Sequence, residues 1–257
     1  MRPVPPTGHW HEDYERGRPG WPAQAAHVAG VPAAATVLEL GAGTGKLTRV
    51  LVARFSRVIA VEPDEAMRGL LASLCPGAEV LAGSAEAIPL ADGSVDAVFA
   101  AEAFHWFDGE RALAEIERVL TPHGALTLMW NVPAGPTEPS TARVEELLTE
   151  RAPPREELGH DPVDLNAARF SSGEWRAPFA ASAFEELREV RLPNPQTLDR
   201  DALVAFFESM GWLGDLPDAE RLSLVDQVRS LLDAHEYRRV WETRVYWSRL
   251  RGGDPPH

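Results

Sequence analysis

The feature that most constrains this chain is a glycine-rich turn between a short apolar run and a helical pattern. Residues 36–40 (TVLEL) predict a buried strand, and residues 46–55 (KLTRVLVARF) have helical spacing. Gly41, Gly43 and Gly45 stand between them, where the backbone must bend sharply and approach a ligand closely. The start of the following helix offers unpaired backbone N–H groups. This strand–turn–helix unit predicts an α/β fold, although many ordinary tight turns also contain glycines.

Strands and helices alternate through the first half of the chain. The strands read as continuous apolar runs, which is typical of parallel strands covered on both faces, and they predict a parallel sheet with helices on both sides. The expected strands are 36–40, 57–61, 78–82, 94–101 and 125–131, and the expected helices are 22–29, 46–55, 64–74 and 110–120. Residues 1–13 read as a loose, Pro-rich arm, and residues 121–124 (TPHG) as a turn.

After Asn131 the pattern changes to a Pro/Gly/Thr linker followed by mixed elements. We expect helices at 141–151, 200–210 and 218–234, strands at 184–192 and 240–250, and irregular structure at 152–182. We interpret the chain as one domain, 1–257, with no internal repeat. Its parts are an N-terminal arm and helix (1–35), a cofactor-binding core (36–131), a cap region with the sixth strand (132–235), and a terminal strand and tail (236–257).

Charge and composition exclude several classes of partner. The net charge of -14 repels phosphate backbones, so a nucleic-acid partner is not expected. Cys75 is the only cysteine, which fits a reducing compartment. No apolar run resembles a signal peptide or the roughly 20 residues of a membrane span. These features predict a cytoplasmic protein without a membrane partner; they do not indicate an oligomeric state.

Two glutamates give the glycine turn a ligand preference. Glu62 ends the second strand, where a carboxylate can bind both ribose hydroxyls of a nucleoside. Glu39 lies two residues before the first glycine, and a carboxylate there suits a ligand with a cationic end better than a pyrophosphate. The spacing is G-x-G-x-G, not the dinucleotide pattern G-x-G-x-x-G. Glu62 alone would also be compatible with a solvated strand end.

Four successive segments carry a family resemblance. VLELGAGTGKLTRVL, AVEPDEAM, GSAEAIPLADGSVDAVFAAEAFHWF and ERVLTPHGALTLMWN resemble, in order and spacing, the motifs of class I S-adenosylmethionine (SAM)-dependent methyltransferases. YERGRPGWP, FHWF and the terminal RRVWETRVYWSRL are similar to the trans-aconitate-methyltransferase-like branch. The resemblance implies a Rossmann-like, seven-stranded, mostly parallel sheet, with helices on both faces and a helical cap inserted after the fifth strand.

The resemblance also implies roles for particular residues. Each role concerns one part of SAM: the methionine end (Glu39, Gly41, Ala42, Gly43), the ribose (Glu62), the adenine (Pro63, Ser84, Ala85, Glu86), the methyl group (101–106, including Glu102), and a covering arm (Tyr14, Arg18). Family members often have Asp where this chain has Ser84, so Glu86 or a backbone carbonyl is the alternative partner for the adenine amine.

His105 is the candidate catalytic residue. Its pKa suits a general base or a substrate-orienting group, but a histidine among Phe104, Trp106 and Phe107 also fits a packing role. Tryptophans are candidates for lining an apolar acceptor pocket: Trp106, Trp130, Trp175 and Trp212. His9 and His11 have the spacing of a metal pair but no neighbouring Cys or acidic ligands, so no metal site is expected.

The predicted function is methyl transfer from SAM to a small-molecule acceptor, a carboxylate, hydroxyl, amine or carbon, by in-line displacement. A non-catalytic SAM-binding protein would share the cofactor motifs and stays an alternative. A nicotinamide-dependent oxidoreductase is less compatible, because Lys46 is the only lysine and lies in the glycine segment, which leaves no Tyr–Lys pair.

Overall fold

The computed structural model of the protein describes residues 10–134, 139–154, 170 and 172–251. Contacts divide the chain into two compact units, which we describe separately. The first unit comprises Met1–Pro19, Val132–Ser172 and Pro193–Glu242. The second comprises Gly20–Asn131, Gly173–Leu192 and Thr243–His257. None of the helices formed by the described residues is long and apolar enough to cross a bilayer.

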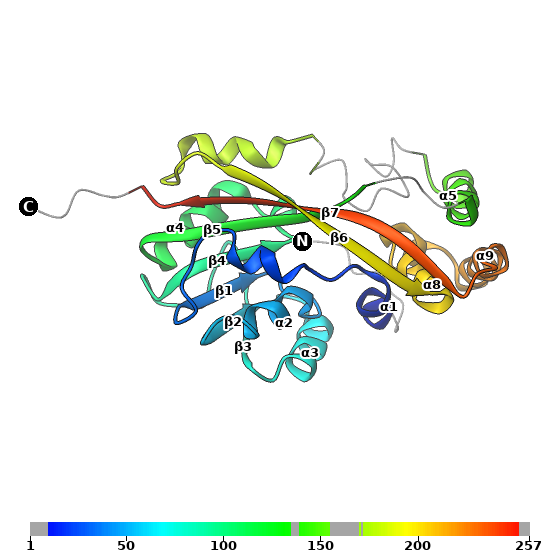
Figure 1. Ribbon diagram of the computed structural model, residues 1–257, viewed down its shortest axis with the longest axis horizontal. Helices are drawn as coiled ribbons and strands as arrows, with labels where there is room; N and C mark the ends of the chain where they lie inside the picture. Colours follow the sequence, from blue (N-terminus) through cyan, green and yellow to red (C-terminus); the bar gives the residue numbers. More distant parts are fainter. Residues whose placement is uncertain (1–9, 135–138, 155–169, 171, 252–257) are drawn as a thin grey trace, which may run out of the picture. The chain divides into compact units, whose positions relative to one another are not determined.

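Seven strands form a single sheet in the order β3-β2-β1-β4-β5-β7-β6. The first five strands pair in parallel, and Figure 1 shows β7 running in the opposite direction to β5. This sheet confirms the predicted Rossmann-like fold class. The strands are β1 (Thr36–Leu40), β2 (Arg57–Val61), β3 (Ala78–Leu81), β4 (Val95–Ala101), β5 (Leu120–Pro133), β6 (Arg188–Asp199) and β7 (Glu236–Arg249).

In the second unit, the central strands are covered on both faces. Val37 and Phe99 belong to one buried cluster with Leu47 and Leu51 of α2. Leu38, equally buried, points to the opposite face because side chains alternate along a strand. The helices of this unit are η1 (Ala23–His27), α2 (Lys46–Val52), α3 (Glu65–Leu74), η2 (Phe104–Trp106), α4 (Gly109–Val119) and η3 (Glu174–Ala181). Asp64 and Asp108 cap α3 and α4 through their side chains.

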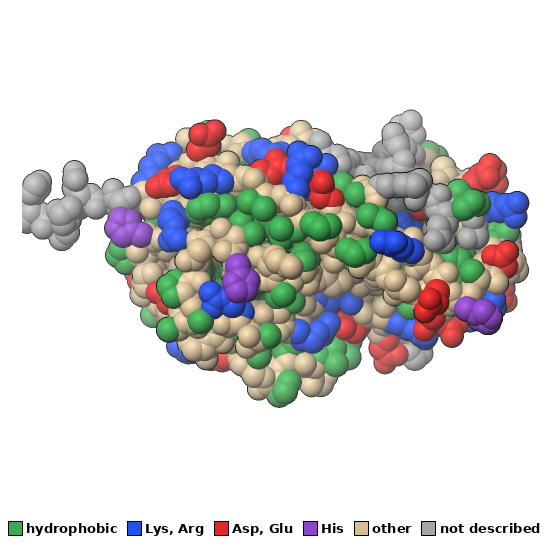
Figure 2. Space-filling view, viewed as in Figure 1, with side chains coloured by type: hydrophobic (Ala, Val, Ile, Leu, Met, Phe, Trp, Pro, Cys, Tyr) green, Lys and Arg blue, Asp and Glu red, His purple; other side chains and the backbone are tan. Residues whose placement is uncertain are grey.

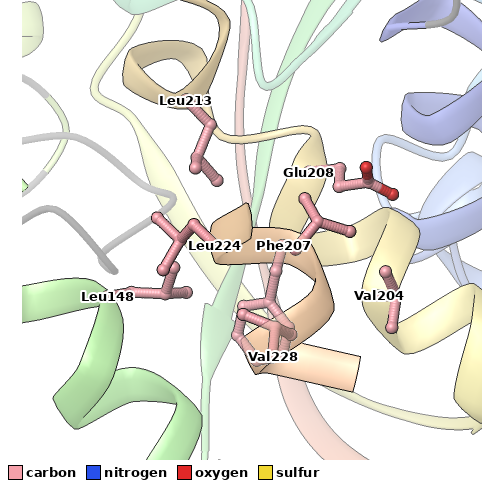
Figure 3. Close-up of a pocket in the computed structure, with 8 residues that line it drawn as sticks. Leu148, Val204, Phe207, Glu208, Leu213, Leu224 and Val228 are labelled. Carbon is pink, nitrogen blue, oxygen red and sulfur yellow. The ribbon is translucent and has the colours of Figure 1, made fainter. Parts of the chain in front are cut away.

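The first unit is mainly helical. Its helices are α1 (Trp10–Gly17), α5 (Pro139–Arg151), α8 (Arg200–Glu208), η4 (Gly211–Asp215) and α9 (Asp218–Leu231). Apolar side chains from α5, α8, η4 and α9 form its core together with the start of β7. Figure 3 shows a small pocket in this core, lined by Leu148, Val204, Phe207, Glu208, Leu213, Leu224 and Val228.

The prediction of a loose arm over residues 1–13 is wrong for its described part, because α1 begins at Trp10. Trp10 is buried and its indole N–H donates to the Ser209 carbonyl at 3.3 Å. Glu12 and Asp13 lie in the first turn of α1, where acidic side chains favour the helix dipole. Tertiary burial of Trp10 therefore stabilises a helix that the neighbouring prolines did not suggest.

Two strand boundaries also differ from the prediction. The predicted turn at 121–124 lies inside β5 as a bulge: Val95 pairs with Leu120 but Ala97 pairs with Ala125, and the extra residues include His123 at φ +64°. The sixth strand begins at Arg188 rather than 184 and continues to Asp199.

Candidate functional site

The candidate site lies in the second unit, where the parallel strands end. Gly41 follows β1, Glu62 follows β2, Glu102 follows β4, and Asn131 lies near the end of β5. Ligands of open α/β sheets bind at this edge. The central residues of the predicted site thus lie together at the carboxyl edge of the parallel strands.

The glycine turn adopts a conformation that only glycine accepts easily. Gly41, Gly43 and Gly45 have φ angles of +66°, +59° and +89°. The N–H groups of Gly41 and Ala42 donate to the Val61 carbonyl at 2.9 and 3.2 Å, which ties the turn to β2. A Cβ added at Gly41 would lie 2.8 Å from the Ala103 Cβ. The turn therefore lies directly against the segment that follows β4.

A third glycine packs over the start of α2. A Cβ added at Gly45 would lie 2.6 Å from the Cys75 Sγ and 2.7 Å from Leu71. Both side chains are buried. Position 45 thus has no room for a side chain, independently of its φ angle.

Glu62 closes the glycine turn with its carboxylate. Its Oε2 accepts a hydrogen bond from the Gly43 N–H at 2.8 Å, and its Oε1 accepts one from the Asp64 N–H at 2.9 Å. Each of these bonds uses one of the two lone pairs of a carboxylate oxygen. The Arg68 guanidinium donates to the Glu62 carbonyl at 3.0 Å. Glu62 is therefore held in a fixed orientation beside the turn.

Glu39 is the most deeply buried acid of the site. It is 1% exposed, and its Oε2 accepts a hydrogen bond from the Thr48 hydroxyl at 2.6 Å. The pKa of Glu39 is raised to about 8, chiefly by burial; the hydrogen bond from Thr48 opposes this shift, the charge of Glu62 adds to it, and Arg49 opposes it. A cation placed beside this carboxyl would favour its ionised form.

Of the residues predicted around the adenine, Pro63 follows β2 and the other three follow β3. Ala85 is buried, whereas Ser84 and Glu86 are half-buried and Pro63 is exposed. The Ser84 carbonyl accepts the Ala87 N–H at 3.3 Å, which forms a tight turn. Glu86 Oε1 accepts the Asp108 N–H at 3.0 Å. This carboxylate is therefore already engaged with the N-cap of α4.

Glu102 occupies a strained backbone conformation at the end of β4. Its φ angle is +50°, a region that non-glycine residues rarely adopt. Its Oε1 accepts the Asn131 N–H at 2.8 Å. Asn131 is itself fixed by the Thr243 hydroxyl, which donates to its Oδ1 at 2.6 Å. These bonds hold a reversal of the chain between β4 and η2.

His105 lies in an aromatic surrounding in η2. It is 8% exposed, and its Nδ1 accepts a hydrogen bond from the Trp130 indole N–H at 3.0 Å. The Trp130 ring stacks on Trp175 with 4.6 Å between the centroids, and Trp175 contacts the Tyr246 ring at 5.0 Å. Two of the tryptophans predicted to line a pocket thus pack against each other behind His105.

Tyr14 and Arg18 belong to the first unit. The Arg18 guanidinium lies 5.2 Å above the Tyr14 ring and donates to the hydroxyl and carbonyl of Ser209 at 2.7 and 2.8 Å. Trp212 is buried in the same unit. The prediction that Tyr14 and Arg18 cover the cofactor stays a prediction.

Sequence reasoning missed two polar residues of the site, Thr48 and Asn131. Thr48 lies one turn into α2, where a hydroxyl in an otherwise apolar face was a usable signal.

Of the two histidines with the spacing of a metal pair, His9 lies outside the described residues. No group of three or more His, Cys, Asp or Glu side chains within the described ranges is placed to hold a metal ion.

Comparison with known proteins assigns the chain to a family. Residues 38–128 match the family described as "Methyltransferase domain". An uncharacterised methyltransferase of Mycobacterium tuberculosis is 38% identical over 222 residues, covering 86% of this chain and 83% of the relative. The chain belongs to the SAM-dependent methyltransferase family. The methyltransferase is also 35% identical to an uncharacterised methyltransferase-like protein of Schizosaccharomyces pombe, with 81% and 78% covered.

A solved structure supports the fold of the methyltransferase. A protein of Anaeromyxobacter dehalogenans, described as a type II methyltransferase, superposes with a TM-score of 0.65 at 24% identity, covering 90% of this chain and 97% of the other. The finer resemblance to the trans-aconitate-methyltransferase-like branch stays a prediction.

The residues of the methyltransferase fit its SAM cofactor. The glycines of the turn place no side chain of their own over its backbone, the Glu62 carboxylate lies beside the turn, and Glu39 offers a buried carboxyl for a cationic end. On the face in Figure 2, basic and acidic side chains are interspersed, so this face has no continuous basic surface for a polyanion.

Proposed function

We propose that the chain transfers a methyl group from SAM to a small-molecule acceptor by in-line displacement, at the carboxyl edge of its parallel strands. The observation that carries the proposal is the hydrogen bond from the Gly43 N–H to Glu62 Oε2 at 2.8 Å. It joins the ligand-approaching turn to the acid expected at the ribose, so the two cofactor elements form one preorganised surface.

In this proposal each described group has one task. Glu39 and the backbone of Gly41, Ala42 and Gly43 hold the methionine end. Glu62 accepts from the ribose hydroxyls. The adenine lies between Pro63 and the turn formed by Ser84, Ala85 and Glu86. Glu102 and His105 border the methyl group.

When bound, SAM supplies a methyl group already activated by its positive sulfur, so the chain chiefly orients the partners and excludes water. The strained Glu102 fixes the path of the chain into η2, and the aromatic cluster behind His105 keeps that side dry. An acceptor seated here exchanges water for fixed dipoles and apolar rings.

The test combines binding with transfer. Calorimetry should detect SAM and S-adenosylhomocysteine but not NAD. Methyl-labelled SAM should then label products in a mixture of small carboxylic acids, phenols and amines. Binding of NAD in place of SAM would overturn the cofactor assignment. Binding of SAM with no labelled product from any acceptor class would favour a non-catalytic SAM-binding protein.

A further inference from the structure

The segment carrying His105 lies against the glycine turn. A Cβ added at Gly41 would meet Ala103 at 2.8 Å and the Phe107 ring at 3.5 Å. His105 lies between these two residues along the chain, in η2, and is 8% exposed. The segment that carries it is thus held beside the loop that binds the methionine end of the cofactor in the proposed function.

The hydrogen bond from Trp130 determines which imidazole nitrogen carries the proton. An indole N–H can donate but cannot accept. Because Trp130 Nε1 lies 3.0 Å from His105 Nδ1, Nδ1 must present its lone pair. The proton of the neutral ring is then on Nε2. A doubly protonated ring would turn an N–H toward another N–H, so Trp130 also opposes the cationic form.

Trp130 cannot easily turn away from this contact. Its side chain has no exposed surface, its ring packs against Trp175 at a tilt of 37°, and its ring centroid lies 5.9 Å from that of Tyr246. The next residue, Asn131, is held by Glu102 and Thr243. The donor is therefore preorganised by packing on one side and by hydrogen bonds on the other.

We propose that Trp130 is a positioning residue that holds His105 as the Nε2–H tautomer, and that His105 donates this hydrogen bond to the methyl acceptor instead of acting as its general base. This inference rests on the proposed function. The lone pair of the acceptor forms the bond to the methyl carbon, the electron pair of the broken carbon–sulfur bond stays on sulfur, and no proton passes to His105. The acceptor must therefore reach the site with its attacking lone pair already available.

The tautomer can be measured without any acceptor. In protein labelled with ¹⁵N-histidine and bound to S-adenosylhomocysteine at pH 7, the signal that disappears in His105→Gln identifies His105 among the eight histidines. Couplings between ring protons and nitrogens should show the proton on Nε2. Trp130→Phe should introduce the Nδ1–H form, whereas Trp106→Phe, a substitution of the ring 5.0 Å away, should not. A wild-type signal with the proton on Nδ1, or a cationic ring, would overturn the proposal even if Trp130→Phe fails to fold.

Turnover separates a donor from a base. In the labelled mixture above, with SAM saturating, His105→Gln keeps an N–H donor and should stay within about tenfold of wild type, while His105→Ala should fall by more than His105→Gln does. Loss of a general base would cost both variants about 10²–10⁴-fold, which would contradict the inference. Failure of the wild type to bind SAM would instead contradict the proposed function, and the same tautomer measurement on the ligand-free protein would still decide the role of Trp130.

Discussion

The Thr48 hydroxyl lies 2.6 Å from Glu39 Oε2 and joins the first helix after the glycine turn to the strand before it. Despite this donor, burial raises the pKa of Glu39 to about 8. The carboxyl therefore holds its proton at neutral pH until a cation approaches. A chain that binds a cationic cofactor thus keeps its most deeply buried site acid uncharged beforehand.

This arrangement predicts that SAM affinity rises with pH. The ionised form of Glu39 interacts best with the cationic end of SAM, and it becomes populated as the pH rises toward 8. A carboxyl that must lose one proton gives up to about a tenfold change in affinity per pH unit below its pKa. Calorimetry from pH 6 to 9 should show this rise in the wild type, with a plateau above 8. Glu39→Gln keeps an acceptor for Thr48 but should lack the part of the rise in SAM affinity that depends on ionisation of Glu39. Identical affinity–pH curves for the two proteins would contradict a role of Glu39 in binding the cationic end of SAM.

Replacing Glu62 should weaken both the cofactor site and the turn. Glu62→Ala removes the acceptor for the Gly43 and Asp64 N–H groups and for the proposed ribose hydroxyls. Charge-assisted hydrogen bonds contribute roughly 1.5–3 kcal/mol each, so SAM affinity should fall at least tenfold and the melting temperature should also fall. Glu65→Ala, an exposed acid on the adjacent α3, is the matched control. Equal SAM affinities for the two variants would exclude Glu62 from the site.

Adding one methyl group at Gly41 should lower stability and SAM affinity more than adding one at Gly69. Gly41→Ala places a Cβ at 2.8 Å from Ala103 and in a left-handed conformation, which itself costs roughly 1–2 kcal/mol. We expect lower stability in urea unfolding and weaker SAM binding. Gly69→Ala is the control, because Gly69 lies within α3 with nothing within 4 Å of its added Cβ. It should be neutral or stabilising by up to about 1 kcal/mol; a similar loss in both variants would argue against a special role for the turn.

The first unit contains a half-buried ion pair whose partners should not be removed singly. Arg239 lies 4.4 Å from the Phe206 ring and its Nη2 is 3.4 Å from Glu145 Oε1. Burial lowers the pKa of Arg239, and Glu145 opposes this shift. Glu145→Leu leaves the guanidinium without its carboxylate and should destabilise the unit by roughly 1–3 kcal/mol.

Adding Arg239→Met to that variant should restore most of the loss, because a long apolar side chain suits the aromatic surroundings. Thermal unfolding of the single and double variants provides the measurement. Glu146→Leu, at an exposed neighbouring position of α5, is the control for the substitution itself. A double variant less stable than Glu145→Leu would show that the guanidinium has another stabilising role.

The central strands were predictable because each is a buried apolar run between turn residues, and β1 and β2 have the bounds expected from the sequence. The sixth strand was placed too early because Pro193 and Pro195 argue against a strand. It lies at the edge of the sheet, where proline is tolerated because the missing N–H has no neighbour to meet. Local pattern identifies a strand but not its place in the sheet.

The candidate site likewise has a part that the sequence predicts and a part that it does not. Glu39, Glu62 and the glycines follow from spacing along the chain, because strand ends of a parallel sheet share one edge. The bond between Trp130 and His105 joins residues 25 positions apart, and its direction depends on two side-chain orientations. Such an orientation arises from packing, so the sequence left general base, orienting group and packing residue as alternatives for His105.

Cys75, the only cysteine, lies buried beneath the glycine turn, 2.6 Å from where a Cβ at Gly45 would stand. A buried thiol reacts with labelling reagents only when the structure above it opens. The rate at which Cys75 is labelled therefore reports how often the glycine turn opens locally. Mass spectrometry can follow this rate, because each labelled molecule gains one reagent mass. If SAM slows this labelling, the fraction of protein labelled at Cys75 would report how much of the chain has SAM bound, without an introduced cysteine or dye.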